Sequence, residues 1–562
     1  MKPWHMDFAC LKDGFGQVSS QFLSVEKDEL FGMVMFSVLL AVPFAPVVLA
    51  LYQRRVQKLM SLSTQSAAVS AAPSAPTEGT KPAAALGSAP TAESLLEAAE
   101  VRGRTLWKAL ALSVTVFSVG IALAITISPD SPGELSRRAL WEWVLAPLGY
   151  LIFVGSLSAP MVLLGVASAR FAGLFWKWFA PAYIAIVAVA MIFEEKMTHA
   201  ERVVTFLQGL VLLAVIYAAL GGRRMRNVVP LLSVLLCLLL LALVILGAAT
   251  TVIGACTDKQ SIVVPLLVSA FTIAGIWAAW RLVLAATDRL ARAYKRKLFS
   301  DAQFQVGAWM VVITLLFAHA PGYTELGLNF WSLGVIPPLI GGLYVYRKLL
   351  RRVEPWKSPR ALLLLRVFAR DKRDERLLDE IAFRWRFIGP IHMIGGPDLA
   401  KTNLEPNELL LFLRRGLRQI FVTDRPSLQR RLTELDVAPD PDGRYRINES
   451  FCSDNVWRET VGELLGISDA ILLDLRGFTA ARRGTAFELR LLAERDALKR
   501  SVVLIDRDTD MSVIEKTIVH IPGAVMPQER VLRSDHTVEG NEIFRLLASG
   551  ALLSNRVPIQ PG

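Results

Sequence analysis

The first two thirds of the chain are dominated by long apolar runs with few charged residues, and these runs limit what the chain can fold into. A helix needs roughly 20 predominantly apolar residues to cross a bilayer, and about nine runs fit that criterion. They are centred near Ser37, Phe117, Phe153, Ile184, Leu212, Leu239, Ala270, Val312 and Ile336. A soluble protein of 562 residues would usually be less apolar than the 53% found here. The sequence therefore predicts a multi-pass α-helical membrane region.

Arginine and lysine residues gather at the ends of these runs and predict their orientation. The clusters are Arg54, Arg55, Lys58, Arg102, Arg104, Lys108, Arg223, Arg224, Arg226, Arg289, Arg292, Lys295, Arg296, Lys297, Arg347, Lys348, Arg351 and Arg352. With about nine spans by the length criterion, all of them fall on one side, which the positive-inside rule assigns to the cytoplasm. We therefore expect an inner-membrane protein with its N-terminus outside and its C-terminal domain in the cytoplasm. The net charge of +12 reflects this topology, and no nucleic-acid partner is expected.

This topology divides the chain into segments. Residues 1–29 are an extracytoplasmic segment, 30–52 form the first span, and 53–104 form a cytoplasmic linker rich in Ala, Pro and Ser. Residues 105–347 hold the other spans, about eight by length, and 348–562 form a cytoplasmic domain. No Asp or Glu lies in the middle of a predicted span, which disfavours an ion-coupled carrier.

From Ser358 onward the pattern changes to short apolar runs that alternate with amphipathic segments. Buried parallel strands are expected at 361–368, 390–394, 469–474 and 501–506, and a pairing at a sheet edge at 445–447. Helices are expected at 371–386, 407–417, 427–435, 455–465, 484–497 and 541–548. This alternation predicts one three-layer, mostly parallel, Rossmann-like α/β domain.

Charged side chains follow the predicted strands, where such folds bind their ligands. The candidate binding residues at the strand ends are Arg370, Asp371, Asp474, Arg476 and Asp506.

The segment after the 469–474 strand carries the candidate catalytic group. Gly484 would let the backbone approach a ligand closely, Thr485 can cap the following helix, and Glu488 would lie one turn into that helix. A carboxylate in this position could attack or stabilise the anomeric carbon of a ribosyl group. Glu488 near a helix start is also favourable through the helix dipole alone, so a structural role stays open.

The residues 484–488, Gly-Thr-Ala-Phe-Glu, match the G-T-A-x-E motif of the nucleoside 2-deoxyribosyltransferase family, which the segment resembles. The layout is also similar to Toll/interleukin-1 receptor-like (TIR) domains, whose glutamate lies in a C-x-x-E-L pattern. Here Glu488-Leu489 keeps the E-L, and 367–371 (Val-Phe-Ala-Arg-Asp) resembles their opening strand and acidic loop. Both resemblances imply that Glu488 is catalytic.

These observations leave three functions open. The first is a membrane-anchored enzyme that cleaves an N-glycosidic bond in a nucleoside, nucleotide or NAD, in signalling or defence. The second is a non-catalytic TIR-like module that binds a nucleotide or assembles into a homo-oligomer, and the third, less favoured, is a channel or carrier. No metal or cofactor is expected, and NAD would enter as a substrate. The cysteines lack metal-ligand spacing, and His392, His520 and His536 are isolated in the sequence.

Overall fold

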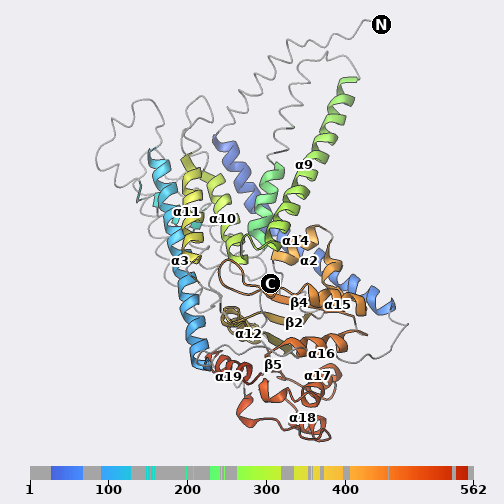
Figure 1. The fold of residues 1–562 in the computed structure, drawn as a ribbon. Coiled ribbons are helices and arrows are strands. Elements are labelled where there is room, and N and C mark those ends of the chain that lie inside the picture. The colour runs from blue at the N-terminus through green and yellow to red at the C-terminus, as the bar shows by residue number, and fades with distance from the viewer. Residues whose placement is uncertain are drawn as a thin grey trace.

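The computed structural model describes residues 27–66, 90–127, 228–240, 263–317, 334–366, 372–395, 406–533 and 540–554, apart from a few positions in these ranges, and other positions scattered between 147 and 246. It contains a helical part and a C-terminal α/β domain (Figure 1). The helical part includes α2 (Lys27–Ser66), α3 (Ala92–Ile127), α9 (Val263–Lys295), α10 (Asp301–Phe317) and α11 (Ile336–Leu350). In Figure 1, α3, α9, α10 and α11 rise from one end of the α/β domain.

Two described helices are long and apolar enough to cross a membrane, namely α2, over Leu39–Leu59, and α3. α3 runs without a break from Ala92, so the end of the predicted linker belongs to the same helix as the second predicted span. The predicted spans near residues 153, 184 and 212 fall almost entirely outside the described residues. The helical part with two long apolar helices is therefore established, and the count of spans stays a prediction.

Small residues let α3 and α11 pack closely. A Cβ on Gly120 would lie 2.8 Å from the side chain of Pro338, and one on Gly342 would lie 3.0 Å from Phe117. The Ser113 hydroxyl also donates a hydrogen bond of 2.7 Å to the carbonyl oxygen of Gly342. The two helices are therefore antiparallel and in contact along most of α11.

The α/β domain is built on a seven-stranded parallel sheet with the order β3-β4-β2-β1-β5-β6-β7. The strands are β1 (Leu362–Arg366), β2 (Ile391–Gly395), β3 (Phe421–Val422), β4 (Ile447–Cys452), β5 (Ala470–Asp474), β6 (Ser501–Ile505) and β7 (Val531–Arg533). The predicted strands at 361–368, 390–394, 469–474 and 501–506 are confirmed. The expectation of edge pairing at 445–447 is wrong, because β4 lies inside the sheet between β3 and β2.

Helices cover both faces of the sheet. They are α12 (Lys372–Trp385), α14 (Pro406–Leu413), α15 (Arg425–Thr433), α16 (Trp457–Ile467), α17 (Arg483–Glu494), α18 (Met511–Ile518) and α19 (Gly540–Leu553). Because side chains alternate along a strand, Leu364 and Leu472 pack in one core with residues of α12 and α19. Leu365 and Leu473 pack on the other face with residues of α16, α17 and α18. The predicted three-layer, Rossmann-like architecture is thus confirmed.

The direction of strand addition reverses between β1 and β5. From β1 the chain adds β2 on one side, and after β4 it returns to add β5 on the other side of β1. Arg366 at the end of β1 is in register with Asp474 at the end of β5. Open α/β sheets bind ligands beyond the carboxyl ends of the strands at such a reversal. This edge therefore locates the candidate site.

Candidate functional site

α17 begins beside this edge, directly after the loop that follows β5. Its N-cap is Arg482, with no side-chain hydrogen bond to the helix, and its first residue is Arg483. The predicted capping role of Thr485 is therefore wrong. Thr485 is the third helical residue, and its side chain is buried along with those of Leu489 and Leu492.

Glu488 lies on the side of α17 that faces α16. A Cβ on Gly484 would lie 3.9 Å from the ring of Trp457 in α16, and Arg495 Nη2 lies 4.0 Å from the Cβ position of Gly462 in the same helix. Gly484, Glu488 and Arg495 share one flank of α17, because residues four and eleven apart lie on the same side of a helix. Glu488 is therefore on the flank of α17 that faces α16, in the layer that covers β1 and β5.

The carboxyl group of Glu488 is half-buried, and no described residue makes a hydrogen bond or ion pair with it. Burial alone raises its pKa to about 8. Burying a carboxyl group without a partner destabilises the fold. Because function can outweigh this cost, groups with strongly shifted pKa values are found most often at functional sites. At pH 7 the group is mainly protonated, and it can donate a proton or a hydrogen bond.

The predicted binding residues after β5 contact each other. Arg476 Nε donates to Asp474 Oδ1 at 2.8 Å, and Arg476 Nη2 lies 2.6 Å from Asp474 Oδ2. This bidentate ion pair is buried, with 7% of each side chain exposed. It fixes the start of the loop that leads to α17.

Asp506, after β6, holds the same loop. Its Oδ1 accepts hydrogen bonds from the backbone N–H of Gly477 at 2.8 Å and from the Thr509 hydroxyl at 2.7 Å. Gly477 has a φ of +66°, which favours glycine. Asp474, Arg476 and Asp506 are therefore brought together at the predicted edge, where both carboxylates hold the loop in place, while Gly484 lies beside Trp457. Arg370 and Asp371 lie outside the described residues.

An aromatic pair lies beside the Glu488 flank and was not predicted as part of the site. The rings of Trp457 and Phe487 are 5.2 Å apart and nearly perpendicular. The exposed guanidinium of Arg458 lies 5.2 Å above the Phe487 ring. Phe487 sits inside the motif at 484–488, but its pairing with Trp457, thirty positions earlier in the chain, requires the packing of α16 against α17.

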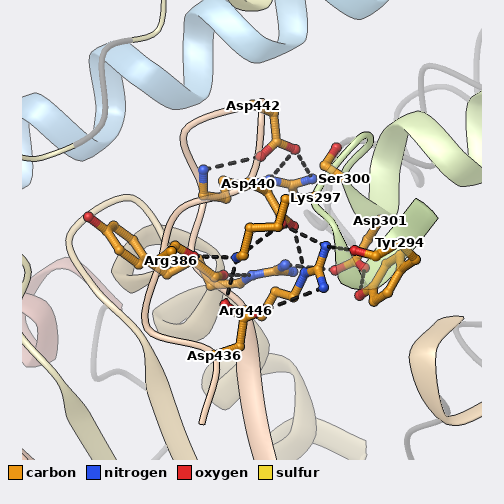
Figure 2. Close-up of polar contacts among 12 residues, drawn as sticks. Tyr294, Lys297, Ser300, Asp301, Arg386, Asp436, Asp440, Asp442 and Arg446 are labelled. Carbon is orange, nitrogen blue, oxygen red and sulfur yellow. Dashed lines mark hydrogen bonds and ion pairs between the residues drawn. The ribbon is translucent and has the colours of Figure 1, made fainter. Parts of the chain in front are cut away.

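A second polar cluster joins the helical part to the α/β domain at the turn between α9 and α10 (Figure 2). Lys297 in this turn has a left-handed backbone, with a φ of 55°. Its Nζ lies 2.6 Å from Asp436 Oδ1 and 3.4 Å from Asp440 Oδ1. The ammonium group also donates a hydrogen bond to the carbonyl oxygen of Ala438.

Arg446 is the centre of this junction network. Its Nη2 lies 2.8 Å from Asp440 Oδ1, and its Nη1 lies 3.3 Å from Asp436 Oδ2. Nη2 also donates to the carbonyl oxygen of Tyr294 at 3.0 Å, and the guanidinium carbon lies 3.7 Å from the centroid of the Tyr294 ring. The side chain of Asp440 is fully buried. The α/β domain thus holds the end of α9 through charge, hydrogen bonding and ring contact at once.

A second branch of the network runs through Asp301, the first residue of α10. Its Oδ2 lies 2.7 Å from Arg386 Nη2, and its Oδ1 accepts the hydroxyl of Tyr294. Arg386 and Arg446 precede β2 and β4, respectively, so the network lies at the amino ends of these strands. It is therefore on the opposite edge of the sheet from the Glu488 site. Its groups are paired with one another, and we assign it a structural role.

His392 in β2 is the most deeply buried ionisable ring in the domain as described. Neither of its ring nitrogens has a hydrogen-bond partner among the described residues. Burial, together with the charge of Arg431, lowers its pKa to about 4. The ring is neutral at pH 7. His392 is the second residue of β2, away from the carboxyl ends of the strands, so it is not part of the candidate site.

The described residues contain no group of three or more His, Cys, Asp or Glu side chains that could hold a metal ion. No family model, no curated protein and no solved structure matches the chain. The function is therefore argued from the geometry of the site.

Proposed function

We propose that the chain is a membrane protein whose cytoplasmic α/β domain binds a nucleoside, a nucleotide or NAD and cleaves its N-glycosidic bond through Glu488. The observation that carries this proposal is the half-buried carboxyl group of Glu488, which has no partner among the described residues and lies beside the edge where β1 and β5 end. The motif at 484–488 adds the resemblance to enzymes that act on ribosyl groups.

The reaction would break the bond between C1′ of the ribosyl group and the base nitrogen, and form a bond from C1′ to water. With a neutral nucleoside, protonated Glu488 gives its proton to the leaving base, and the attacking water returns a proton to the carboxylate. With NAD, the positive charge of the nicotinamide ring favours the ionised carboxylate. Nicotinamide then leaves with the bonding electron pair, the carboxylate stabilises the oxocarbenium-like state, and it takes the proton from the water that adds to C1′ and later releases it to solvent.

The test uses the full-length protein purified in detergent. Release of free base from NAD and from a panel of nucleosides is measured by chromatography for the wild type, Glu488→Gln and Glu494→Gln. Glu494 is an exposed carboxylate on the same helix and serves as the matched control. We expect turnover in the wild type and the control, and a loss of at least about a hundredfold in Glu488→Gln, as for removal of a general acid. Equal turnover in Glu488→Gln would refute the assignment.

A non-catalytic, TIR-like binding and assembly module is the second candidate. It is favoured by the internal pairing of Asp474 with Arg476 and of Asp506 with the loop, because these groups are then not free to hold a substrate. Calorimetric binding of NAD by the wild type without any base release, unchanged in Glu488→Gln, would favour this second function.

A further inference from the structure

Four helices of the helical part each change from exposed apolar residues to exposed cations toward the α/β domain. On α2 the exposed apolar residues run to Leu51, and exposed Arg54, Arg55 and Lys58 follow. On α9 they run from Leu266 to Trp280, Arg281 lies against the ring of Trp277, and exposed Arg289, Arg292, Lys295 and Arg296 follow. The exposed apolar stretch of α9 rises about 21 Å along the helix, roughly two thirds of the thickness of a hydrocarbon core.

α3 and α11 show the same change, and their packing places both changes at the same height. On α11, exposed Ile340 and Tyr344 precede exposed Arg347, Lys348 and Arg351. On α3, which runs in the opposite direction, exposed Arg104 and Lys108 precede exposed Leu112. Because Gly342 contacts Phe117 and the helices are antiparallel, Lys348 and Arg351 lie level with the region around Lys108.

We call these exposed cations the basic collar, formed by Arg54, Arg55, Lys58, Arg104, Lys108, Arg289, Arg292, Lys295, Arg296, Arg347, Lys348 and Arg351. Acidic residues neutralise little of it. Arg104 lies 3.8 Å from Glu100 in an exposed pair, and the collar residues other than Arg104 and Lys58 make no ion pair with a described residue. The collar therefore presents a concentrated positive charge.

Exposed aromatic side chains lie near the change on both helices, at its apolar side on α11 and among the cations on α3. Tyr344 is 60% exposed with Lys348 Nζ 5.7 Å from its ring, and Trp107 is exposed next to Lys108. Tyr and Trp are enriched where a helix leaves the hydrocarbon for the headgroups. Exposed apolar residues on one side, aromatic residues near the boundary and exposed cations on the other side describe a surface shaped for lipid headgroups.

We infer that the basic collar binds the headgroups of anionic phospholipids in the leaflet on the side of the α/β domain. This inference rests on the membrane location proposed above. Each cation near an anionic leaflet gains an attraction that salt weakens. The collar does more than set the orientation of the helices, because its cations come from four separate helices and lie at the end of each apolar stretch that is nearer the α/β domain.

The test compares lipid preference in liposomes. Full-length protein is reconstituted in phosphatidylcholine with one third phosphatidylglycerol. Quenching of tryptophan fluorescence by brominated forms of either lipid then gives their relative binding constant. One collar variant is Arg289→Gln/Arg292→Gln/Lys295→Gln, and a second is Arg54→Gln/Arg55→Gln on a different helix. The matched control is Lys499→Gln/Lys516→Gln/Arg533→Gln, which removes exposed cations from the far part of the α/β domain.

We expect the wild type and the control to prefer phosphatidylglycerol several-fold, and each collar variant to lose most of that preference. High salt should reduce the preference of the wild type. Equal binding of both lipids by the wild type, or a preference that survives in both collar variants, would overturn the inference and leave the membrane location intact. A protein that is stripped from its native membranes by alkaline carbonate would instead overturn the membrane location itself.

Discussion

At the scale of single residues, Glu488 combines a functional position with a cost in stability. Its pKa of about 8 in the folded protein lies above its ordinary value of 4.5, because the half-buried carboxyl group is desolvated and no described residue pairs with it. The folded state then holds a proton that the unfolded state releases. This contribution to stability is complete below about pH 4.5 and is lost as the pH rises through 8.

The substitution Glu488→Gln should therefore stabilise the protein at alkaline pH while removing activity. At pH 8.5 we expect its free energy of unfolding to exceed that of the wild type by roughly 2 kcal/mol, after allowance for the partial exposure of the side chain. Near pH 4.5 the two proteins should be equally stable. Thermal unfolding across this pH range measures the effect, with Glu494→Gln as the control. Parallel pH profiles for the wild type and Glu488→Gln would show that the carboxyl group is well solvated.

At the scale of elements, the sequence predicted the strands whose residues are apolar on both faces. β1, β5 and β6 have near-continuous apolar runs, as parallel strands buried on both faces require. β4 was missed as an interior strand because its sequence alternates polar residues. Asn448 is buried because its side chain bonds both backbone groups of Asp436, and Ser450 is buried because Arg431 donates to its hydroxyl. Neither set of hydrogen bonds can be predicted from the residues of β4 alone.

The junction network was beyond sequence analysis for the same reason. Arg446 and Tyr294 are 152 positions apart, and the charges of this region resemble an ordinary solvated loop in the sequence. The site at 474–488 was predictable in part, because its motif is continuous in the chain. The aromatic neighbour Trp457 was not, because only the packing of α16 against α17 brings it to Gly484.

Removal of one partner from the junction network should be costly. Arg446→Met leaves the fully buried carboxylate of Asp440 without its main partner, and such changes destabilise proteins by about 3–5 kcal/mol. Asp440→Asn in the same chain removes the unpaired charge and should recover much of that loss. Thermal unfolding of the full-length single and double variants gives the coupling between the two residues. If the losses of the single variants simply add, the pairing does not stabilise the junction.

At the scale of the whole molecule, the helical part and the Glu488 site lie on different sides of the sheet. α3 packs against α19 and α12, which cover one face, and Arg545 of α19 pairs with Glu93 of α3 at 2.9 Å. α16 and α17, which hold Glu488, cover the other face. The sheet therefore separates the contacts with the helical part from the candidate site, and the junction network joins the amino ends of β2 and β4 to α9 and α10.

The orientation of this assembly can be tested from the position of the basic collar. The collar and the α/β domain are on the same side of the apolar stretches of α2, α3, α9 and α11, and the positive-inside rule assigns that side to the cytoplasm. Cys452 is buried and is a poor reporter, whereas Lys516 on α18 is exposed. In a chain with Cys10 and Cys256 changed to Ser, Lys516→Cys should react with a membrane-impermeant maleimide only after the cells are permeabilised. Reaction in intact cells would place the α/β domain outside and would remove cytoplasmic NAD and nucleotides as its substrates.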